Sequence, residues 1–205
     1  MNNLQPILLV DAGTGNLHSV YNALQTLGAQ VTLISDPAGL RGGGRIVLPG
    51  VGAFGKFMEG LREKDLEASL LEAARRGDPL LGICVGMQAL FALSEEMGQY
   101  AGLELLPGKV VRFPDTLGLK VPHTGWNQLW PASDSPLFNQ LTPGAYAYFN
   151  HAYYCEADPQ DTTATTDYGL TYACMVRRDN LYGVQFHPEK SQRVGQQILK
   201  NFIEL

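Results

Sequence analysis

Hydrophobic residues in the first half of the chain form short continuous runs that alternate with segments of helical periodicity. The runs with the length of a buried strand are residues 7–10, 31–34, 45–48 and 80–83. Apolar residues recur at helical spacing in residues 17–27 and 57–76, and Gly77 is a typical helix stop. Alternating strands and helices with short connections predict a mostly parallel central sheet that is flanked by helices on both faces.

The second half of the chain is richer in strand patterns and in turns. Its strand-like segments are residues 109–113, 118–130, 145–155, 162–166, 170–176 and 181–186. We expect these segments to form antiparallel additions to the same sheet, or a small second sheet. Residues 191–205 read as a closing helix with Val194, Ile198, Phe202 and Leu205 on one stripe. The whole pattern predicts an α/β fold in a single domain over residues 1–205.

Charge and composition argue against two classes of function. The chain has 205 residues, a formal net charge of -5 and scattered basic residues, so it lacks the basic patch of a nucleic-acid-binding protein. No apolar run approaches the roughly 20 residues that span a bilayer, and residues 1–6 lack the pattern of a secretory signal. We therefore expect a cytoplasmic protein that binds neither nucleic acid nor membrane.

Cys84 is the strongest candidate for a reactive group. It lies between Gly82 and Gly86, where an apolar strand breaks and a helix is expected to begin. This is the G-x-S-x-G nucleophile elbow with sulfur in place of oxygen, in which a strained turn displays the nucleophile and glycines avoid a collision. A helix N-terminus favours a thiolate by about 0.3–1 kcal/mol. Because this does not suffice at neutral pH, a base is also required.

A candidate base and a group to orient it follow the last predicted strand. His187 stands before Pro188 at the end of that strand, and Glu189 is two residues further on. Side chains two apart in an extended segment point to the same side, so the carboxylate is expected to meet the far ring nitrogen. Taken singly, each residue would more often be structural. The combination of Cys84, His187 and Glu189 favours a catalytic triad, since parallel strands deliver their ends to one edge of a sheet.

The remaining cysteines and histidines give no sign of a disulfide framework or a metal site. Cys155 and Cys174 lie in apolar strand-like runs without C-x-x-C spacing, and we expect them to be buried. The histidines are isolated from one another along the chain and lack H-x-x-x-H spacing. We therefore expect neither a metal nor a cofactor.

Several short segments resemble a known family. Residues 82–88 (GICVGMQ) and 186–191 (FHPEKS) are similar to the signatures of class I, or triad, glutamine amidotransferases, which have a flavodoxin-like fold. Blocks spread over nearly the whole chain resemble the glutaminase subunits of imidazole glycerol phosphate synthases: DAGTGNL at 11–17, LPGVGAF at 48–54, VPHTGWN at 121–127 and YFNHAY at 148–153. Val85 and Thr124 replace the common leucine and methionine, and neither change removes a reacting group.

The resemblance implies a role for each member of the triad. Cys84 would attack the side-chain amide of L-glutamine, His187 would transfer the proton, and Glu189 would orient His187. Ammonia would leave, and water would hydrolyse the thioester to glutamate.

The resemblance also implies the groups that surround the reacting amide. The backbone N–H groups of Val51 and Val85 are expected to form the oxyanion hole, although the loop at 49–52 is equally compatible with an ordinary tight turn. The residues expected to contact glutamine are Gly50, Gly52, Gln88, Ala152 and Tyr153.

A glutaminase that supplies ammonia needs an acceptor site, which the resemblance places on a separate cyclase subunit with a (β/α)8 barrel in a heterodimer. That subunit would use ammonia to make imidazole glycerol phosphate and aminoimidazole carboxamide ribotide in histidine biosynthesis. Asn16, Trp126, Tyr148 and Lys190 match positions near the interface. Trp126 suits an interface anchor, and core packing is the alternative for this residue.

Three other functions compete with this one. The first is that of another class I amidotransferase, which would serve the synthesis of pyridoxal phosphate, guanylate or anthranilate. A cysteine peptidase on a similar elbow is a second alternative, which Gln88 and the loop at 49–52 disfavour. A regulatory protein with a relic triad is the third.

Overall fold

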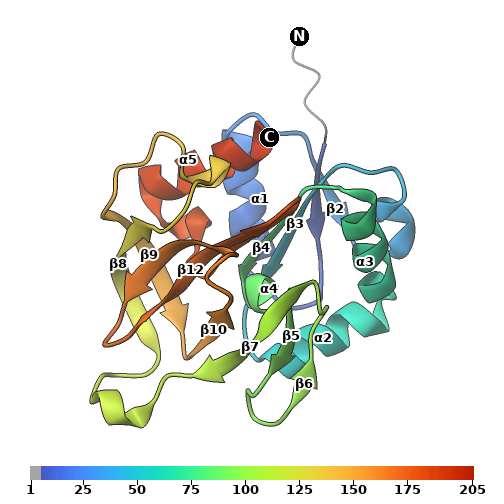
Figure 1. Ribbon diagram of the computed structural model, residues 1–205. Coiled ribbons are helices and arrows are strands. Elements are labelled where there is room, and N and C mark those ends of the chain that lie inside the picture. The colour runs from blue at the N-terminus through green and yellow to red at the C-terminus, as the bar shows by residue number, and fades with distance from the viewer. Residues whose placement is uncertain (1–5) are drawn as a thin grey trace.

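A nine-stranded mixed sheet forms the centre of the fold in the computed structural model, which describes residues 6–205 (Figure 1). Its parallel strands, in spatial order, are β2 (Val31–Ile34), β1 (Ile7–Val10), β3 (Arg45–Gly50), β4 (Leu80–Cys84) and β13 (Leu181–Val184). The sheet continues antiparallel through β12 (Thr171–Arg178), β11 (Thr162–Asp167), β8 (His123–Pro131) and β9 (Ala145–His151). The predicted α/β fold with antiparallel additions is confirmed.

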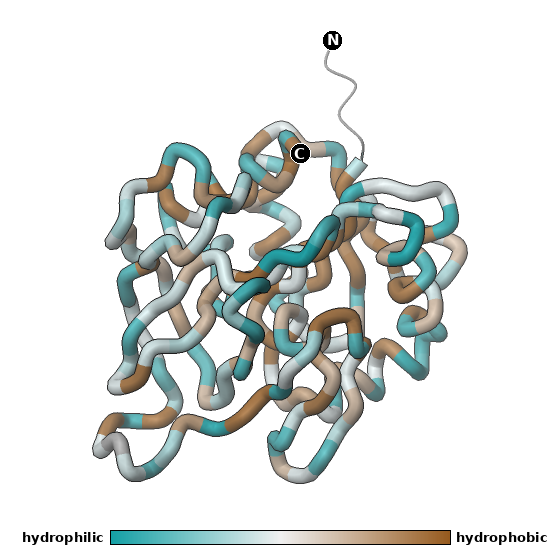
Figure 2. The backbone as a smooth tube through the Cα atoms, viewed as in Figure 1, coloured by the Kyte–Doolittle hydropathy of each residue, from teal (hydrophilic) through white to brown (hydrophobic). Residues whose placement is uncertain are grey.

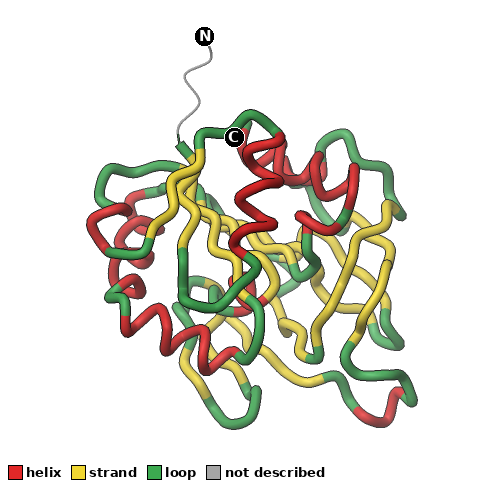
Figure 3. The backbone as a smooth tube through the Cα atoms, turned by 180° about the vertical axis from the view of Figure 1, so that it is seen from behind, coloured by secondary structure: helices red, strands yellow, loops and turns green. Residues whose placement is uncertain are grey.

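Helices cover both faces of the parallel half of the sheet. Helices α1 (Leu17–Thr26) and α5 (Gln192–Ile203) pack on one face, and α2 (Phe54–Glu63) and α3 (Leu66–Arg76) pack on the other (Figures 1 and 3). Strands β1, β3, β4 and β13 are buried along their whole length, which explains their continuous apolar sequences. Hydrophobic segments accordingly gather along these inner strands in Figure 2. In the described part of the chain, no helix is long and apolar enough to cross a membrane.

A second, four-stranded sheet lies beside the central one. Its strands, in spatial order, are β10 (Tyr153–Ala157), β7 (Leu106–Arg112), β5 (Phe91–Ser94) and β6 (Tyr100–Ala101). Both arrangements expected for the second half of the chain are therefore present, because some strands extend the large sheet and others form the small one. The remaining elements are a one-turn helix α4 (Val85–Gln88) and the 3-10 turns η1 (Pro37–Leu40), η2 (Asp115–Leu117), η3 (Pro136–Phe138) and η4 (Pro188–Lys190).

The single helix predicted over residues 57–76 is wrong. Two helices occupy this region, α2 begins earlier at Phe54, and the break falls at Asp65, whose φ of 55° is left-handed. Aspartate tolerates this conformation better than most residues, and an α-helix cannot continue through it. Lys64, just before the break, donates to the backbone oxygen and the carboxylate of Asp11, 2.9 and 2.8 Å away. Gly77 ends α3 in the left-handed conformation, as predicted.

Three predicted strands are also shorter than expected, and one of them, predicted at 181–186, ends at Val184. The segment 145–155 is interrupted at Ala152, and its halves β9 and β10 belong to different sheets. The segment 118–130 begins its strand only at His123, because Pro122 cannot donate a ladder hydrogen bond. The break at Ala152 matters for the site, since it turns the backbone of Ala152 and Tyr153 toward the edge where Cys84 lies.

Candidate active site

The carboxyl ends of three neighbouring strands meet at one edge of the central sheet. Gly50 at the end of β3 is the register partner of Cys84 at the end of β4. On the other side of β4, Val184 of β13 pairs with Ile83, and His187 follows shortly after. Parallel strands therefore bring Cys84, the turn after Gly50 and His187 to the same edge.

The backbone at Cys84 is strained. Its φ of 55° and ψ of -110° lie outside the conformations that side chains ordinarily adopt, at a cost of about 1–3 kcal/mol. The turn is packed so closely that a Cβ on Gly82 would lie 2.5 Å from the backbone oxygen of Gly86. A Cβ on Gly86 would lie 1.8 Å from the backbone oxygen of Leu48 in β3. These contacts give the physical reason for both glycines of the elbow.

The helix after Cys84 is shorter than a nucleophile elbow predicts. Helix α4 is a single turn from Val85 to Gln88, after which the chain enters β5. A helix this short carries only a small dipole, so its contribution to a thiolate rests on the free N–H groups of its first turn. Most of the electrostatic support for Cys84 must therefore come from His187.

His187 and Glu189 form a buried pair. His187 Nδ1 lies 3.0 Å from Glu189 Oε1, and their side chains are 4% and 1% exposed. This hydrogen bond places the proton on Nδ1 and leaves Nε2 for Cys84. The expectation that strand alternation aligns the two side chains is wrong. Strand β13 ends at Val184, and the 3-10 turn η4 from Pro188 to Lys190 brings the carboxylate back to the ring.

Hydrogen bonds to β9 hold the backbone of His187. Its N–H donates to the backbone oxygen of Tyr148 at 2.9 Å. The hydroxyl of the buried Ser191 donates to the backbone oxygen of His187 at 2.6 Å, and its oxygen accepts from the N–H of Tyr148 at 2.9 Å. Ser191 therefore links the backbones of His187 and Tyr148, a contact that the motif by itself does not reveal.

Charge on the imidazole is favoured by its two neighbours. Burial by itself lowers the pKa of His187, but hydrogen bonds to Cys84 and Glu189 outweigh it and raise the pKa to about 10. His123 and His151 differ from His187 in this respect, because burial lowers the pKa of His123 to about 4 and that of His151 to about 3. At neutral pH His187 is therefore an imidazolium and the other two rings are uncharged.

NMR of the ring nitrogens tests these charge states. In protein with 15N-labelled histidine, we expect His187 to remain protonated from pH 6 to about 9, and His123 and His151 to remain neutral down to about pH 5. Glu189→Gln removes a hydrogen-bonded carboxylate and should lower the pH at which His187 titrates, while the exposed control Glu156→Gln should not. A wild-type His187 that titrates near pH 6.5 would contradict the assignment.

A cavity of 280 Å³ opens at this edge of the sheet. Predicted site residues that line it are Asn16, Val51, Gly52, Cys84, Val85, Gln88, Ala152, Tyr153, His187 and Lys190. Glu189 is absent from the lining, and so is Gly50, which was expected to contact glutamine but pairs with Cys84 inside the sheet. Segments that are far apart in sequence thus line one space, whose volume is close to the lower end for small-molecule sites.

Three residues of the lining were not predicted. Glu96, Asn150 and His151 complete the wall of the cavity. Glu96 lies in the turn after β5, and its carboxylate accepts a hydrogen bond of 2.7 Å from the N–H of Phe54. Burial raises the pKa of Glu96. Neither β5 nor this turn was predicted, so no sequence pattern connected Glu96 with Cys84.

The expectation that the histidines are isolated is wrong for one pair. His123 and His151 are cross-strand partners in β8 and β9, and their rings approach to 3.3 Å between Nδ1 and Nε2. Residues 6–205 contain no group of three or more His, Cys, Asp or Glu side chains that could hold a metal ion. Cys155 and Cys174 are buried free thiols whose pKa values are raised by burial.

The residues expected at a partner interface lie together near the mouth of the cavity. Trp126 is 45% exposed, and its ring meets that of its cross-strand partner Tyr148 edge to face at 6.1 Å. Lys190 Nζ lies 5.9 Å from the centre of the Tyr148 ring. Lys190 and Asn16 both line the cavity, so this surface is continuous with the candidate active site.

Comparison with known proteins gives the class of protein that has this fold and site. A family model described as glutamine amidotransferase class-I matches residues 8–205, so the chain belongs to the class I glutamine amidotransferases. The fold agrees with that of a crystal structure of a glutamine amidotransferase, with a TM-score of 0.73 at 19% identity over 96% of this chain and 97% of that one. It also agrees with the structure of PurLQS from Thermotoga maritima, with a TM-score of 0.72 at 18% identity over 98% of each chain.

Within this class the chain belongs to the family of imidazole glycerol phosphate synthase subunits HisH. It is 50% identical over 203 residues to the HisH subunit of Moorella thermoacetica, covering 98% of this chain and 96% of the relative. It is 49% identical over 197 residues to that of Symbiobacterium thermophilum, covering 96% of this chain and 92% of the relative.

Proposed function

We propose that this chain, as a single amidotransferase domain, hydrolyses L-glutamine to glutamate and ammonia and delivers the ammonia to a cyclase subunit. That subunit would make imidazole glycerol phosphate and aminoimidazole carboxamide ribotide in histidine biosynthesis. The observation that carries the proposal is the strained Cys84 at the wall of the cavity, beside the buried pair of His187 and Glu189. The full-length similarity to HisH subunits supports the choice of acceptor.

In this mechanism Cys84 and His187 act as a thiolate–imidazolium pair. The thiolate attacks the side-chain amide carbon of glutamine, and a carbon–sulfur bond forms as the carbonyl oxygen becomes an oxyanion. His187 gives its proton to the amide nitrogen, the carbon–nitrogen bond breaks and ammonia leaves. His187 then takes a proton from water, which attacks the thioester and releases glutamate. Glu189 keeps the ring of His187 in the orientation that presents Nε2 throughout.

The oxyanion requires hydrogen-bond donors that are already in place. Val51 and Val85 follow the ends of two neighbouring strands and line the same cavity, so their N–H groups are the proposed donors. Loss of one such donor typically costs about 2.7–4 kcal/mol of transition-state stabilisation. Gly50 and Gly52 on either side of Val51 permit its peptide plane to rotate, and Gly52 has a φ of 88°.

The rest of the cavity holds the amino-acid end of glutamine. Gln88 and the backbone of Ala152 and Tyr153 contact the substrate, together with Gly52 near the oxyanion. Glu96 brings a half-buried carboxylate to the same wall, and it is the charge complement of the α-ammonium group of glutamine. No cofactor or metal takes part.

The acceptor is a cyclase subunit with a (β/α)8 barrel, bound as a heterodimer in the cytoplasm. Asn16, Trp126, Tyr148 and Lys190 form the proposed contact surface around the mouth of the cavity. A large aromatic side chain that is nearly half exposed suits an interface anchor. With a net charge of -5, the chain is not expected to bind nucleic acid or an anionic membrane.

Glutaminase activity that depends on the partner tests this function. We expect little glutamate from the isolated chain, and at least about tenfold more after addition of the cyclase and its nucleotide substrate, because the Val51 N–H must turn toward the oxyanion. The measurement is glutamate formed per minute, with and without the liganded partner. Full-rate hydrolysis by the isolated chain, unchanged by the partner, would rule out this coupling. Ammonia transfer to pyridoxal phosphate, guanylate or anthranilate synthesis instead would rule out the proposed acceptor.

A further inference from the structure

Gln185 is a buried polar residue beside the nucleophile that the mechanism has not used. Its side chain is fully buried just after the end of β13, and its backbone N–H donates to Cys174 O at 2.9 Å. Its Oε1 lies 3.2 Å from Gln88 Nε2, and its Nε2 lies 3.8 Å from Cys84 Sγ. The side-chain amide of Gln185 therefore connects the thiol with a residue of the proposed glutamine site.

The orientation of both amides follows from one backbone carbonyl. The oxygen of Tyr153 can only accept, and Gln88 Nε2 donates to it at 2.9 Å. The second hydrogen on Gln88 Nε2 then points to Gln185, which must present Oε1 to it. As a result Gln185 presents its N–H to Cys84 Sγ, and Gln88 uses both hydrogens internally. Gln88 is left with its own Oε1 as the group it can offer to a donor on glutamine.

A second branch of hydrogen bonds reaches the same carbonyl through His151. His151 Nδ1 donates to Tyr153 O at 2.8 Å, so His151 Nε2 accepts from the Tyr172 hydroxyl at 2.9 Å. The Tyr172 oxygen accepts from His123 Nδ1 at 3.0 Å, and His123 Nε2 accepts from Asn127 at 3.3 Å. Each donor meets an acceptor with both rings neutral, as their lowered pKa values require. This series of hydrogen bonds thus fixes the backbone carbonyl of Tyr153, which orients the side chain of Gln88.

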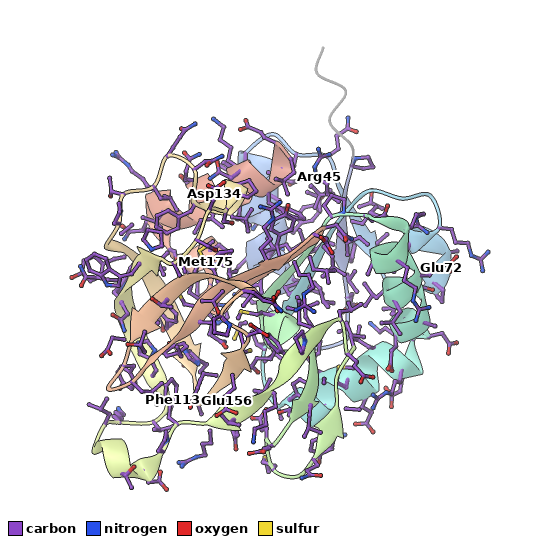
Figure 4. All side chains as sticks on the ribbon, viewed as in Figure 1. Arg45, Glu72, Phe113, Asp134, Glu156 and Met175 are labelled. Carbon is purple, nitrogen blue, oxygen red and sulfur yellow. The ribbon has the colours of Figure 1, made fainter. Side chains whose placement is uncertain are left out.

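Close packing holds this branch in place. Phe113, labelled in Figure 4, contacts the Tyr172 ring edge-on at 5.3 Å and the His151 ring at 5.4 Å. His123 stacks between Phe149 at 4.8 Å and Tyr168 at 4.0 Å. Rings confined in this way cannot turn to new partners, so the hydrogen-bond directions are set by the fold.

We propose that Gln185 is a positioning residue for glutamine hydrolysis: its Oε1 fixes the Gln88 amide for substrate binding, and its N–H supports the sulfur of Cys84. This inference rests on the proposed function. The two ends of one amide then have separable effects. Loss of the contact to Gln88 weakens substrate binding, and loss of the contact to sulfur slows the chemical step.

Two substitutions separate the two ends. Gln185→Met has a similar length but removes both the acceptor and the donor. Gln185→Glu keeps an oxygen for Gln88 but replaces the N–H that faces Cys84 with an oxygen. Gln128→Met is the matched control, because this glutamine lies on β8 and is absent from the lining of the cavity. Each variant is assayed for glutamate formation in the complex with the cyclase and its nucleotide substrate.

The number of active sites is measured by labelling the Cys84 thiol with an electrophilic glutamine analogue, and each rate is divided by this number. A smaller fraction of folded protein therefore does not lower the reported rate. We expect kcat to fall about tenfold in Gln185→Met and in Gln185→Glu, and KM to rise about tenfold in Gln185→Met alone, because a single buried unpaired group has roughly this effect. Gln128→Met should stay within about twofold of wild type. Unchanged kcat and KM in Gln185→Met, or an equal rise of KM in both variants, would overturn the inference. A wild-type complex that forms no glutamate would instead refute the proposed function.

Discussion

Replacing Cys84 with alanine is expected to abolish glutamine-dependent synthesis while leaving ammonia-dependent synthesis unchanged. The thiol is the only protein group in the proposed mechanism that bonds to the amide carbon, so its loss should lower the glutamine-dependent rate at least about 1000-fold. Added ammonia bypasses this site and reaches the acceptor directly. Both rates are measured with the reconstituted pair of subunits, with either glutamine or an ammonium salt as the nitrogen source.

A matched control variant distinguishes the loss of a reacting thiol from the loss of a buried side chain. Cys174→Ala also removes a buried thiol, but Cys174 lies on β12 and is absent from the lining of the cavity. It should keep both rates within about threefold. Residual glutamine-dependent synthesis in Cys84→Ala above about a hundredth of the wild-type rate would exclude Cys84 as the nucleophile. This outcome would instead favour the alternative that the triad is a relic and that the protein only regulates its partner.

Gly86→Ala is expected to destabilise the fold strongly. A Cβ at Gly86 would lie 1.8 Å from Leu48 O and 2.9 Å from Leu48 C, which are backbone atoms that no side-chain rotation can move away. To avoid this collision, β3 must move away from α4, and this movement separates the turn that contains Val51 from Cys84. We expect the free energy of unfolding to fall by at least about 4 kcal/mol, as for other substitutions that force the core apart. Urea unfolding measures the change.

Gly42→Ala is the control for this substitution. A Cβ at Gly42 would meet no atom within 4 Å, and its backbone is not left-handed. Its unfolding free energy should be unchanged or higher by up to about 1 kcal/mol, because alanine restricts the unfolded chain. If Gly86→Ala unfolded within about 1 kcal/mol of wild type, the close packing of the elbow against β3 would be incorrect.

The parallel half of the fold was predictable because four of its five strands are buried on both faces. A strand with no exposed face contains a run of apolar residues, and the runs at 7–10 and 80–83 lie in β1 and β4. The break at Asp65 was not predictable, since the helical period continues on both sides of it. Lys64 beside the break binds Asp11 at the end of β1, a partner that is remote in sequence.

The antiparallel half was predicted less well because strand patterns do not name their partners. Residues 145–155 form one continuous strand-like segment, yet β9 pairs with β8 and β10 pairs with β7. The separation at Ala152 depends on which neighbours compete for each ladder. The pairing of β8 with β9 also brings His123 to His151, although the two are distant along the chain.

Local sequence was enough to predict the parallel core, the elbow with Cys84, and the motif that contains His187 and Glu189. These features depend on residues close together in the chain, where steric limits and side-chain period act directly. The folded chain was needed to see that Glu96 shares a cavity with Cys84, that η4 rather than a strand aligns Glu189, and that Gln185 connects Cys84 to Gln88. These features depend on hydrogen bonds and packing between distant segments, and such contacts exist only once the sheet has set the register of its strands.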